Sequence, residues 1–271
     1  MAELLNNAKS FVTSQSGSLV DSVKGGNPLA LSIAVIVGVV VLFYLYHYTM
    51  KGMRNLNYFR RGSPFIIKDT KDGKKRVVVG QDPTKDGNIS LPRSNNETGG
   101  IEFSYTCWLY IDDFSYKLGQ WKHIFHKGNE SSWPLRAPGV WLHPNKNALR
   151  VYMNSYNEIS EYLDIDNIPV NKWFSLILVL RGQNMDIYIN GNLKKSLKLS
   201  GIPKQNYGEL YVNSFGGFSG FISKLRYYDW ALNYSEIDGI QKTGPSLRVE
   251  QSSIKDNERP PYLTPNWWTN E

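Results

Sequence analysis

One stretch near the middle of the chain constrains the fold more than any other. Residues 172–190 read KWFSLILVLRGQNMDIYIN, and Gly191 follows them. The apolar run 174–180 predicts a buried strand, and the alternation of apolar and polar residues over 185–190 predicts a second strand. Asn190 and Gly191 both tolerate positive φ, as a two-residue type I′ turn requires, so a third strand is expected from about Asn192. Three successive antiparallel strands therefore predict a chain built largely from β-sheet.

A second long strand is expected upstream, at residues 101–112. Its odd-numbered residues, Ile101 to Ile111, are apolar and alternate with a more polar set, which indicates one core face and one half-polar face. Cys107, the only cysteine, belongs to the core-facing set, so a packing role is expected and no internal disulfide can form. Shorter strands are expected at 123–127, 140–143, 149–153, 160–164, 209–212 and 221–228, and one short helix near Asn233 or Ser235. Many short strands separated by Gly, Pro and Asn turns predict an all-β, two-sheet antiparallel sandwich.

An uncharged run precedes this region. Residues 29–48 read LALSIAVIVGVVVLFYLYHY, and about twenty residues at ~1.5 Å rise give roughly 30 Å, the thickness of a hydrocarbon core. The run predicts a single transmembrane helix over 29–50, with tyrosines at one interface. The residues expected to anchor it are Leu29, Ile33, Val37, Val41, Tyr44 and Tyr48.

Basic residues follow the uncharged run. Lys51, Arg54, Arg60 and Arg61 lie on its C-terminal side, against Lys24 alone on the N-terminal side. The positive-inside rule then predicts a cytosolic C-terminal part, and these four cations are expected to contact lipid headgroups. The net charge of +7 fits either phosphate-bearing partners or a solvated surface beside a membrane. We see no nucleic-acid-binding motif, so no nucleic-acid partner is expected.

The expected organisation has five parts. They are an amphipathic N-terminal segment (1–28), the transmembrane helix (29–50), a basic juxtamembrane linker (51–100), the sandwich (101–243) and a tail containing Pro and Trp (244–271). In the tail, Trp267 and Trp268 follow several prolines. Exposed tryptophans in an aperiodic segment indicate either a docking peptide or a segment that folds back on the sandwich.

Five blocks in the sandwich region carry a family resemblance. In chain order they are FSYTCWLYIDD, IFHKGN, GVWLHPNKNALRVYM, IPVNKWFSLILVLRGQNMDIYINGNL and GGFSGFISKLRYYDWALNYSEI. Their order and spacing over about residues 100–240 resemble the laminin-G-like, concanavalin A-like jelly-roll family. The resemblance implies a two-sheet antiparallel jelly roll. Because this fold hosts lectins, glycoside hydrolases and interaction modules, it leaves the function open.

The residues do not predict catalysis. Retaining glycoside hydrolysis needs two carboxylates about 5 Å apart, and in this fold they would come from an E-x-D-x-x-E strand, which we do not find. The nearest group, residues 158–166, has the wrong spacing and is interpreted as a solvated strand face. We therefore expect a non-enzyme.

A cofactor is not expected either. His123 and His126, three residues apart on an extended strand, are expected on opposite faces and so form no metal pair. The resemblance leaves room for a calcium ion at a loop rim, where Asp112, Asp113 or Asn145 could supply oxygens, although no recognisable ligand set is present.

Aromatic and cationic residues near turns are the candidate contacts. Trp133, Arg136, Trp141 and His143 could stack and hydrogen-bond a glycan or anchor a protein partner, as could Trp267 and Trp268 in the tail. The alternative is that the tryptophans pack the rims of the sheets.

The architecture is also similar to membrane-associated minor capsid proteins of large icosahedral DNA viruses. That resemblance implies a non-catalytic structural adaptor in the virion, which links the internal membrane to the capsid shell. Its partners would be the lipid bilayer and other capsid or membrane proteins. The alternative is a membrane-displayed lectin that binds glycans.

Overall fold

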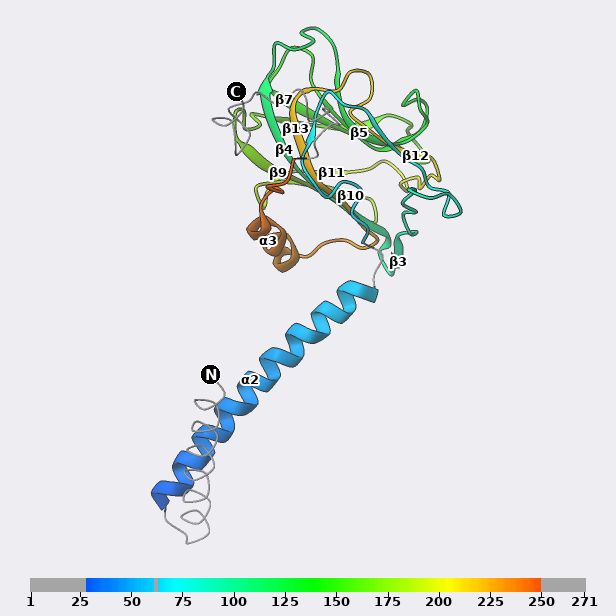
Figure 1. Ribbon diagram of the computed structural model, residues 1–271. Helices are drawn as coiled ribbons and strands as arrows, with labels where there is room; N and C mark the ends of the chain where they lie inside the picture. Colours follow the sequence, from blue (N-terminus) through cyan, green and yellow to red (C-terminus); the bar gives the residue numbers. More distant parts are fainter. Residues whose placement is uncertain (1–27, 61–62, 250–271) are drawn as a thin grey trace, which may run out of the picture. The chain divides into compact units, whose positions relative to one another are not determined.

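The computed structural model describes residues 28–60 and 63–249 (Figure 1), without the side chains of 29–31, 33–34, 50–60 and 95–96. The chain forms two compact units that divide after Arg60. The expected N-terminal segment up to residue 27 lies outside the described residues, as do Arg61 and the tail from residue 250, with Trp267 and Trp268.

The first unit contains the helix α2 (Pro28–Arg60). It extends ten residues beyond the C-terminal end of the expected helix, because the basic segment 51–60, which was expected to be linker, continues it. The large apolar side chains described between Val35 and Tyr48 are 48% to 68% exposed. Among the described residues, no helix combines the length and the apolar character that crossing a bilayer requires.

The second unit is a two-sheet antiparallel sandwich, as expected. The seven-stranded sheet contains, in spatial order, β1 (Lys71–Asp72), β13 (Ser219–Tyr228), β4 (Gly100–Asp113), β9 (Trp173–Arg181), β10 (Asn184–Ile189) and β11 (Asn192–Lys198), with β3 (Asn95–Glu97) also paired to β4. The six-stranded sheet contains β2 (Val77–Val79), β12 (Glu209–Val212), β5 (Lys122–Gly128), β6 (Arg136–Leu142), β7 (Ala148–Met153) and β8 (Glu161–Asp166).

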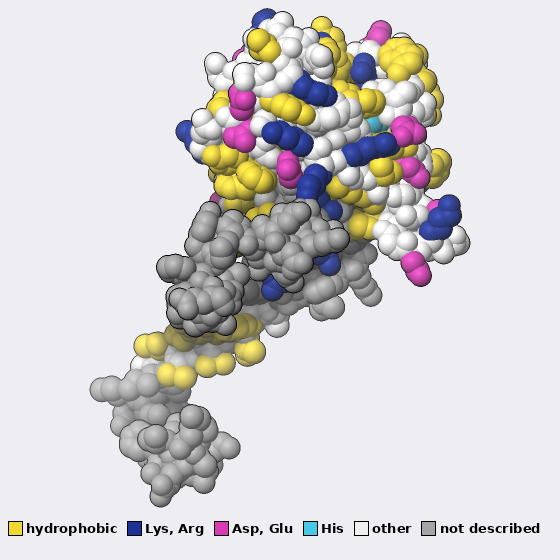
Figure 2. All heavy atoms as spheres, turned by 45° about the horizontal axis from the view of Figure 1, so that its top comes forward, with side chains coloured by type: hydrophobic (Ala, Val, Ile, Leu, Met, Phe, Trp, Pro, Cys, Tyr) yellow, Lys and Arg dark blue, Asp and Glu magenta, His cyan; other side chains and the backbone are white. Residues whose placement is uncertain are grey.

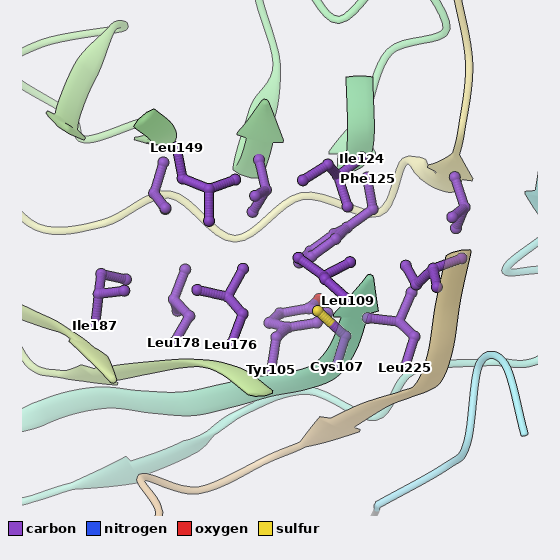
Figure 3. Close-up of a cluster of buried hydrophobic side chains, with 14 of the residues drawn as sticks. Tyr105, Cys107, Leu109, Ile124, Phe125, Leu149, Leu176, Leu178, Ile187 and Leu225 are labelled. Atoms are coloured by element: carbon purple, nitrogen blue, oxygen red, sulfur yellow. The ribbon is translucent and has the colours of Figure 1, made fainter. Parts of the chain in front are cut away.

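The core lies between the two sheets, as Figure 3 shows. Alternate residues of each strand point inward, so β4 contributes Tyr105, Cys107 and Leu109, and the facing strand β5 contributes Phe125. Burying a side chain of this size contributes about 1.5–3 kcal/mol. The inward position of Cys107 is confirmed, and burial raises the pKa of its thiol, so the sulfur acts as a packing group.

The three strands expected around residue 180 are β9, β10 and β11. The hairpin turn between the last two has φ of 51° at Asn190 and 76° at Gly191, which confirms the positive-φ pair. β11 is an edge strand, and its exposed side chains include Lys194, Lys195 and Lys198.

The N-terminal boundary of the sandwich differs from the expectation. Residues 63–99 were expected to be a linker with one short strand at residues 76–79. That strand is confirmed as β2, but β1 and β3 also form, and all three pair with strands of the two sheets. Ile66 and Ile67 are buried in the core. These strands are two or three residues long, too short to give a periodic signal in the sequence.

The expected short helix is α3 (Tyr234–Thr243). Asn233 caps it through a reciprocal capping box with Glu236, which satisfies two otherwise free backbone N–H groups. Its one fully buried residue, Ile237, joins a second apolar cluster with the outward-facing Ile177 and Val179 of β9. α3 therefore covers part of the outer face of the seven-stranded sheet.

Candidate binding face

The outer face of the six-stranded sheet carries a continuous group of aromatic and cationic side chains, here called the aromatic face. Its members are Trp121, His123, His126, Trp133, Arg136, Trp141, His143, Arg150, Tyr152, Tyr162, Tyr211 and Phe215. In the space-filling view, basic side chains lie among hydrophobic ones over the folded unit (Figure 2).

Strand alternation places these residues together. Leu149, Val151 and Met153 of β7 belong to the core, so Arg150 and Tyr152 between them point outward. The same alternation in the neighbouring strands turns Trp141, Tyr162 and Tyr211 outward. The face is thus the polar and aromatic half of the pattern that forms the core.

Arg150 stands at the centre of one half of the face. Its guanidinium makes two parallel bonds to the Asp164 carboxylate, with Nε–Oδ1 and Nη2–Oδ2 distances of 2.6 and 2.7 Å. It also lies 3.9 Å from the ring centroid of Tyr162 and 4.8 Å from that of Trp121. The hydrogen bonds from Arg150 lower the pKa of Asp164, so this carboxylate is an ionised, occupied acceptor. It is not part of the solvated strand face that the sequence suggested.

Arg136 sits at the other end of the face. Its guanidinium carbon lies 3.6 Å from the centroid of Tyr152 and 5.7 Å from that of Trp133, and Nη2 donates to Ser160 Oγ at 3.1 Å. Its Nε is buried and has no hydrogen-bond partner among the described residues. Burial lowers the pKa of Arg136 from its ordinary value, although the group stays charged. A cation held between aromatic rings with a free N–H is suited to an incoming acceptor.

His123 and His126 are in direct contact, with 2.7 Å between His123 Nε2 and His126 Nδ1. The prediction that they lie on opposite faces is wrong, because a β-bulge at Ile124 adds one residue to β5 and turns both side chains to the same face. The Ser214 backbone N–H donates to His123 Nδ1 at 2.9 Å, and His126 Nε2 lies 2.7 Å from the Asn129 carbonyl oxygen. This chain of bonds requires both rings to be neutral, each with its proton on Nε2.

The environment keeps these histidines neutral. Burial lowers the pKa of His123 well below its ordinary value, and the neighbouring His126 lowers it further. Burial also lowers the pKa of His126, although its bond to Asn129 acts in the opposite direction. Neither ring has a free nitrogen for a metal ion, and no group of three or more His, Cys, Asp or Glu suited to a metal occurs within the described ranges.

The loop between β12 and β13 places Phe215 over the histidines. Asn213, Phe215, Gly216 and Gly217 all have positive φ, and a Cβ at Gly217 would lie 1.9 Å from the Gly73 carbonyl oxygen, so only glycine fits there. The Phe215 ring stacks on Trp141, with centroids 5.5 Å apart and planes 22° apart. It is nevertheless 46% exposed, so it contributes an accessible aromatic surface.

The structure brings four of the predicted contact residues to this one face. Trp133 is 55% exposed and lies beside Arg136. Trp141 is buried against His123. The His143 ring packs on Trp121, with 5.2 Å between the ring centroids. The indole Nε1 of Trp141 is buried without a partner in the described part of the chain. Whether these residues bind a ligand stays a prediction.

Several members of the face were missed in the sequence. Trp121, Arg150, Tyr152, Tyr162, Tyr211 and Phe215 were not singled out. The alternation in ALRVYM could have identified Arg150 and Tyr152 as outward-facing, since their neighbours are plainly core residues. Phe215 carried no such signal, because its position depends on the loop geometry.

The fold defines the chain as an all-β sandwich, and comparison of its sequence with family models agrees. A model described as the concanavalin A-like lectin/glucanases superfamily matches residues 83–238, more than half of the 271 residues. The chain belongs to this family. No curated protein matches the sequence.

Solved structures similar to this chain include binding domains of botulinum neurotoxins. The serotype G binding domain has 16% identity and a TM-score of 0.46, and the match covers 64% of this chain and 46% of that one. The receptor binding domain of neurotoxin D has 15% identity and a TM-score of 0.48, with 67% and 47% covered. The binding domain of neurotoxin DC in complex with rat synaptotagmin II has 16% identity and a TM-score of 0.43, with 56% and 40% covered. The chain thus spans less than half the length of these structures, and a likeness of this size says nothing about function.

Proposed function

We propose that this chain is a non-catalytic, membrane-anchored binding protein that docks a neighbouring protein on the aromatic face. The observation that carries the proposal is the composition of that face: exposed rings at Trp133, Tyr162 and Phe215 around two ring-stacked arginines. Tryptophan, tyrosine and arginine are the residue types that most often dominate binding energy at protein interfaces. They present large, rigid contact areas at a low cost in side-chain entropy.

The absence of catalysis is part of the proposal. The Asp164 carboxylate is engaged by Arg150, and at the margin Glu130 forms an ion pair with Arg76. A carboxylate held by an arginine is a poor general acid, because the cation stabilises the ionised form. The face is therefore better suited to binding than to cleaving a sugar chain.

The membrane anchor rests on the sequence. The run from Leu29 to Tyr48 contains no charged residue, and an uncharged helix of this length in water exposes apolar surface at a free-energy cost of roughly 25 cal/mol per Å². Lys51, Arg54, Arg60 and Arg61 would contact headgroups. The setting that we propose is the inner membrane of a large DNA virus, with capsid or membrane proteins as neighbours and the sandwich on the cytosolic side or inside the capsid.

Carbonate extraction of membranes that contain the full chain tests the anchor. We expect the protein to stay in the membrane pellet, and release into the supernatant would disprove anchoring. A variant with Val37→Asp and Val41→Asp should be released, because two charges in the run cost about 5 kcal/mol or more on insertion scales.

Incorporation into particles or membrane assemblies tests the face. We expect the Trp133→Ala, Phe215→Ser double variant to be incorporated at least about tenfold less than the wild type, as loss of two aromatic anchors implies. The matched control is Tyr156→Ser, since Tyr156 is 71% exposed and lies outside the face. Equal incorporation of both variants would refute docking through the face.

A second candidate function is glycan binding. The buried Trp141 Nε1 and Arg136 Nε, both without partners among the described residues, are donors of the kind that orient a sugar hydroxyl below a stacking ring. A glycan array probed with the full chain in nanodiscs separates the two functions. Saturable binding that Trp133→Ala removes would favour the lectin, and an empty array would leave protein docking.

A further inference from the structure

A cavity at one end of the sandwich lies outside the aromatic face. We call it the end pocket, and its volume is about 480 Å³, within the roughly 300–1,000 Å³ typical of small-molecule sites. The two sheets line it with Phe103 and Tyr105 of β4, Tyr227 of β13, Lys127 of β5 and Ala137 of β6, and the segments 81–94 and 204–207 form its walls.

The floor of the pocket is aromatic. The ring centroids of Tyr105 and Tyr227 are 5.0 Å apart, and the Phe103 ring lies 5.9 Å from that of Tyr105. Figure 3 shows Tyr105 standing between the two sheets. Burial raises the pKa of both tyrosines, so their hydroxyls stay protonated and remain donors. This floor suits a flat or apolar ligand body with a polar edge.

A lysine without a carboxylate partner stands beside this floor. Lys127 is 8% exposed, and its Nζ donates to the backbone oxygens of Asn206 and Gly208, both at 2.8 Å. An ammonium group has three N–H donors, so one remains. No described carboxylate forms an ion pair with Lys127, and burial alone lowers its pKa to about 8. A buried cation that lacks an anion is costly, and a bound anion would offset that cost.

The charged residues that line the pocket also favour an anionic ligand. Besides Lys127, the lining includes Arg93 and Lys204, whereas its one carboxylate is Asp82. Asp82 already accepts bonds from the Thr84 backbone N–H and hydroxyl, at 3.0 and 2.7 Å. The lining therefore carries an excess of positive charge, which favours anions.

Side-chain amides hold the walls in place. Gln81 Nε2 donates to the Ile89 carbonyl oxygen and Gln81 Oε1 accepts from the Leu91 N–H, both at 3.1 Å. On the other wall, Asn206 Nδ2 donates to the Lys127 carbonyl oxygen at 3.0 Å. Ser94 Oγ, also in the lining, is buried without a partner among the described residues. The pocket is thus preformed, with a hydroxyl left for a ligand.

We propose that the end pocket binds a small organic anion, whose ring or short hydrocarbon body lies on Tyr105 and Tyr227 and whose acid group meets Lys127. The Ser94 hydroxyl and the third Nζ proton would bond the acid oxygens. This site is separate from the aromatic face and does not depend on its function.

Calorimetry with the full chain in nanodiscs tests the proposal with two matched probes, 2-naphthoate and the neutral 2-naphthamide. We expect saturable binding of the acid, at least about tenfold tighter than that of the amide, the size of one charge-assisted hydrogen bond. Equal binding of the two probes, or no saturable binding of the acid up to about 1 mM, would overturn the proposal.

Three variants test whether the probes bind in the end pocket. Lys127→Met should remove the preference for the acid, and Ala137→Phe should remove binding of both probes by filling the pocket. The control Lys146→Met, an exposed lysine outside the lining, should bind as the wild type does. Unchanged acid binding in both pocket variants would exclude the site.

Photo-crosslinking of the wild type keeps the test decisive if a pocket variant does not fold. A diazirine derivative of 2-naphthoate should label residues in 81–94 or 204–207. Labelling of the aromatic face instead, at Trp133 or Phe215, would overturn the assignment.

Discussion

The two outer faces of the sandwich are built differently. On the seven-stranded sheet, α3 covers an aliphatic patch, and buried polar groups secure the contact: Ser104 Oγ donates to the Trp230 carbonyl oxygen at 2.9 Å and accepts from the Leu232 N–H at 3.0 Å. On the six-stranded sheet the described residues include no covering helix, and the aromatic side chains pack against one another and against arginines. A face that is covered contributes to stability, whereas a face whose rings support one another can stay open to a partner.

The largest expected effect is on the covered face. Ile237→Ala should lower the free energy of unfolding by about 3 kcal/mol, because it removes a buried side chain and leaves a cavity beneath α3. Chemical denaturation of the full chain measures the loss. A loss below about 1 kcal/mol would mean that the helix adds little to the sandwich and that the two faces are more alike than we argue.

The second-largest expected effect is a loss of folding stability at acidic pH. His123 and His126 have lowered pKa values in the folded state, so below their ordinary value of about 6.5 the unfolded chain binds protons that the folded chain does not. Stability should therefore be complete above about pH 6.5 and fall as the pH drops, by on the order of 2 kcal/mol between pH 7 and pH 5. Unfolding curves at both pH values check this.

A variant pair identifies the titrating groups. His123→Gln with His126→Gln should flatten the acid dependence, even though the double change lowers stability at every pH. His143→Gln, whose ring packs on Trp121 at the edge of the face, should keep the slope of the wild type. A steep slope in the double variant would assign the acid sensitivity to other groups.

A smaller effect is expected at the ion pair inside the aromatic face. Asp164→Asn should cost about 1 kcal/mol of stability, since a bidentate, partly buried pair exceeds the usual surface salt bridge. The exposed helix pair Asp238–Lys242 gives the control, because Asp238→Asn should change stability less. If the control loses as much, the Arg150 cluster has no special role in ordering the face.

The smallest expected effect on stability gives the clearest test of the difference between the covered face and the aromatic face. Phe215→Ser should change the free energy of unfolding by less than about 1 kcal/mol, because nearly half of the ring is already exposed. A cost near that of Ile237→Ala would show that Phe215 covers its sheet as α3 covers the other, which would argue against an open binding face.

The strands and the site differ in how well the sequence predicts them. Alternation identified β4 and β10, an apolar run identified β9, the Asn190-Gly191 turn indicated β11, and the Asn233 cap located α3, because all of these signals are local. The short strands β1 and β3 were taken for linker, because pairing with other strands, which no local pattern records, holds them in the sheet.

The site was predicted only in part. Trp133, Arg136 and Trp141 could be singled out by residue type, but the bulge that unites His123 with His126 depends on the register between β5 and β6. The contact between Phe215 and Trp141 likewise depends on a loop with four positive φ angles. Such three-dimensional coincidences leave little trace in a single sequence.

The lysines of β11 affect whether copies of this domain aggregate through their sheet edges at high local concentration. A bare edge strand offers unpaired amide and carbonyl groups that can recruit a strand from another molecule, and repeated recruitment leads to insoluble polymers. Charged ammonium groups at Lys194 and Lys198 repel the same edge of a second copy. Copies concentrated side by side would therefore stay separate, and higher-order assembly would be left to specific contacts between side chains.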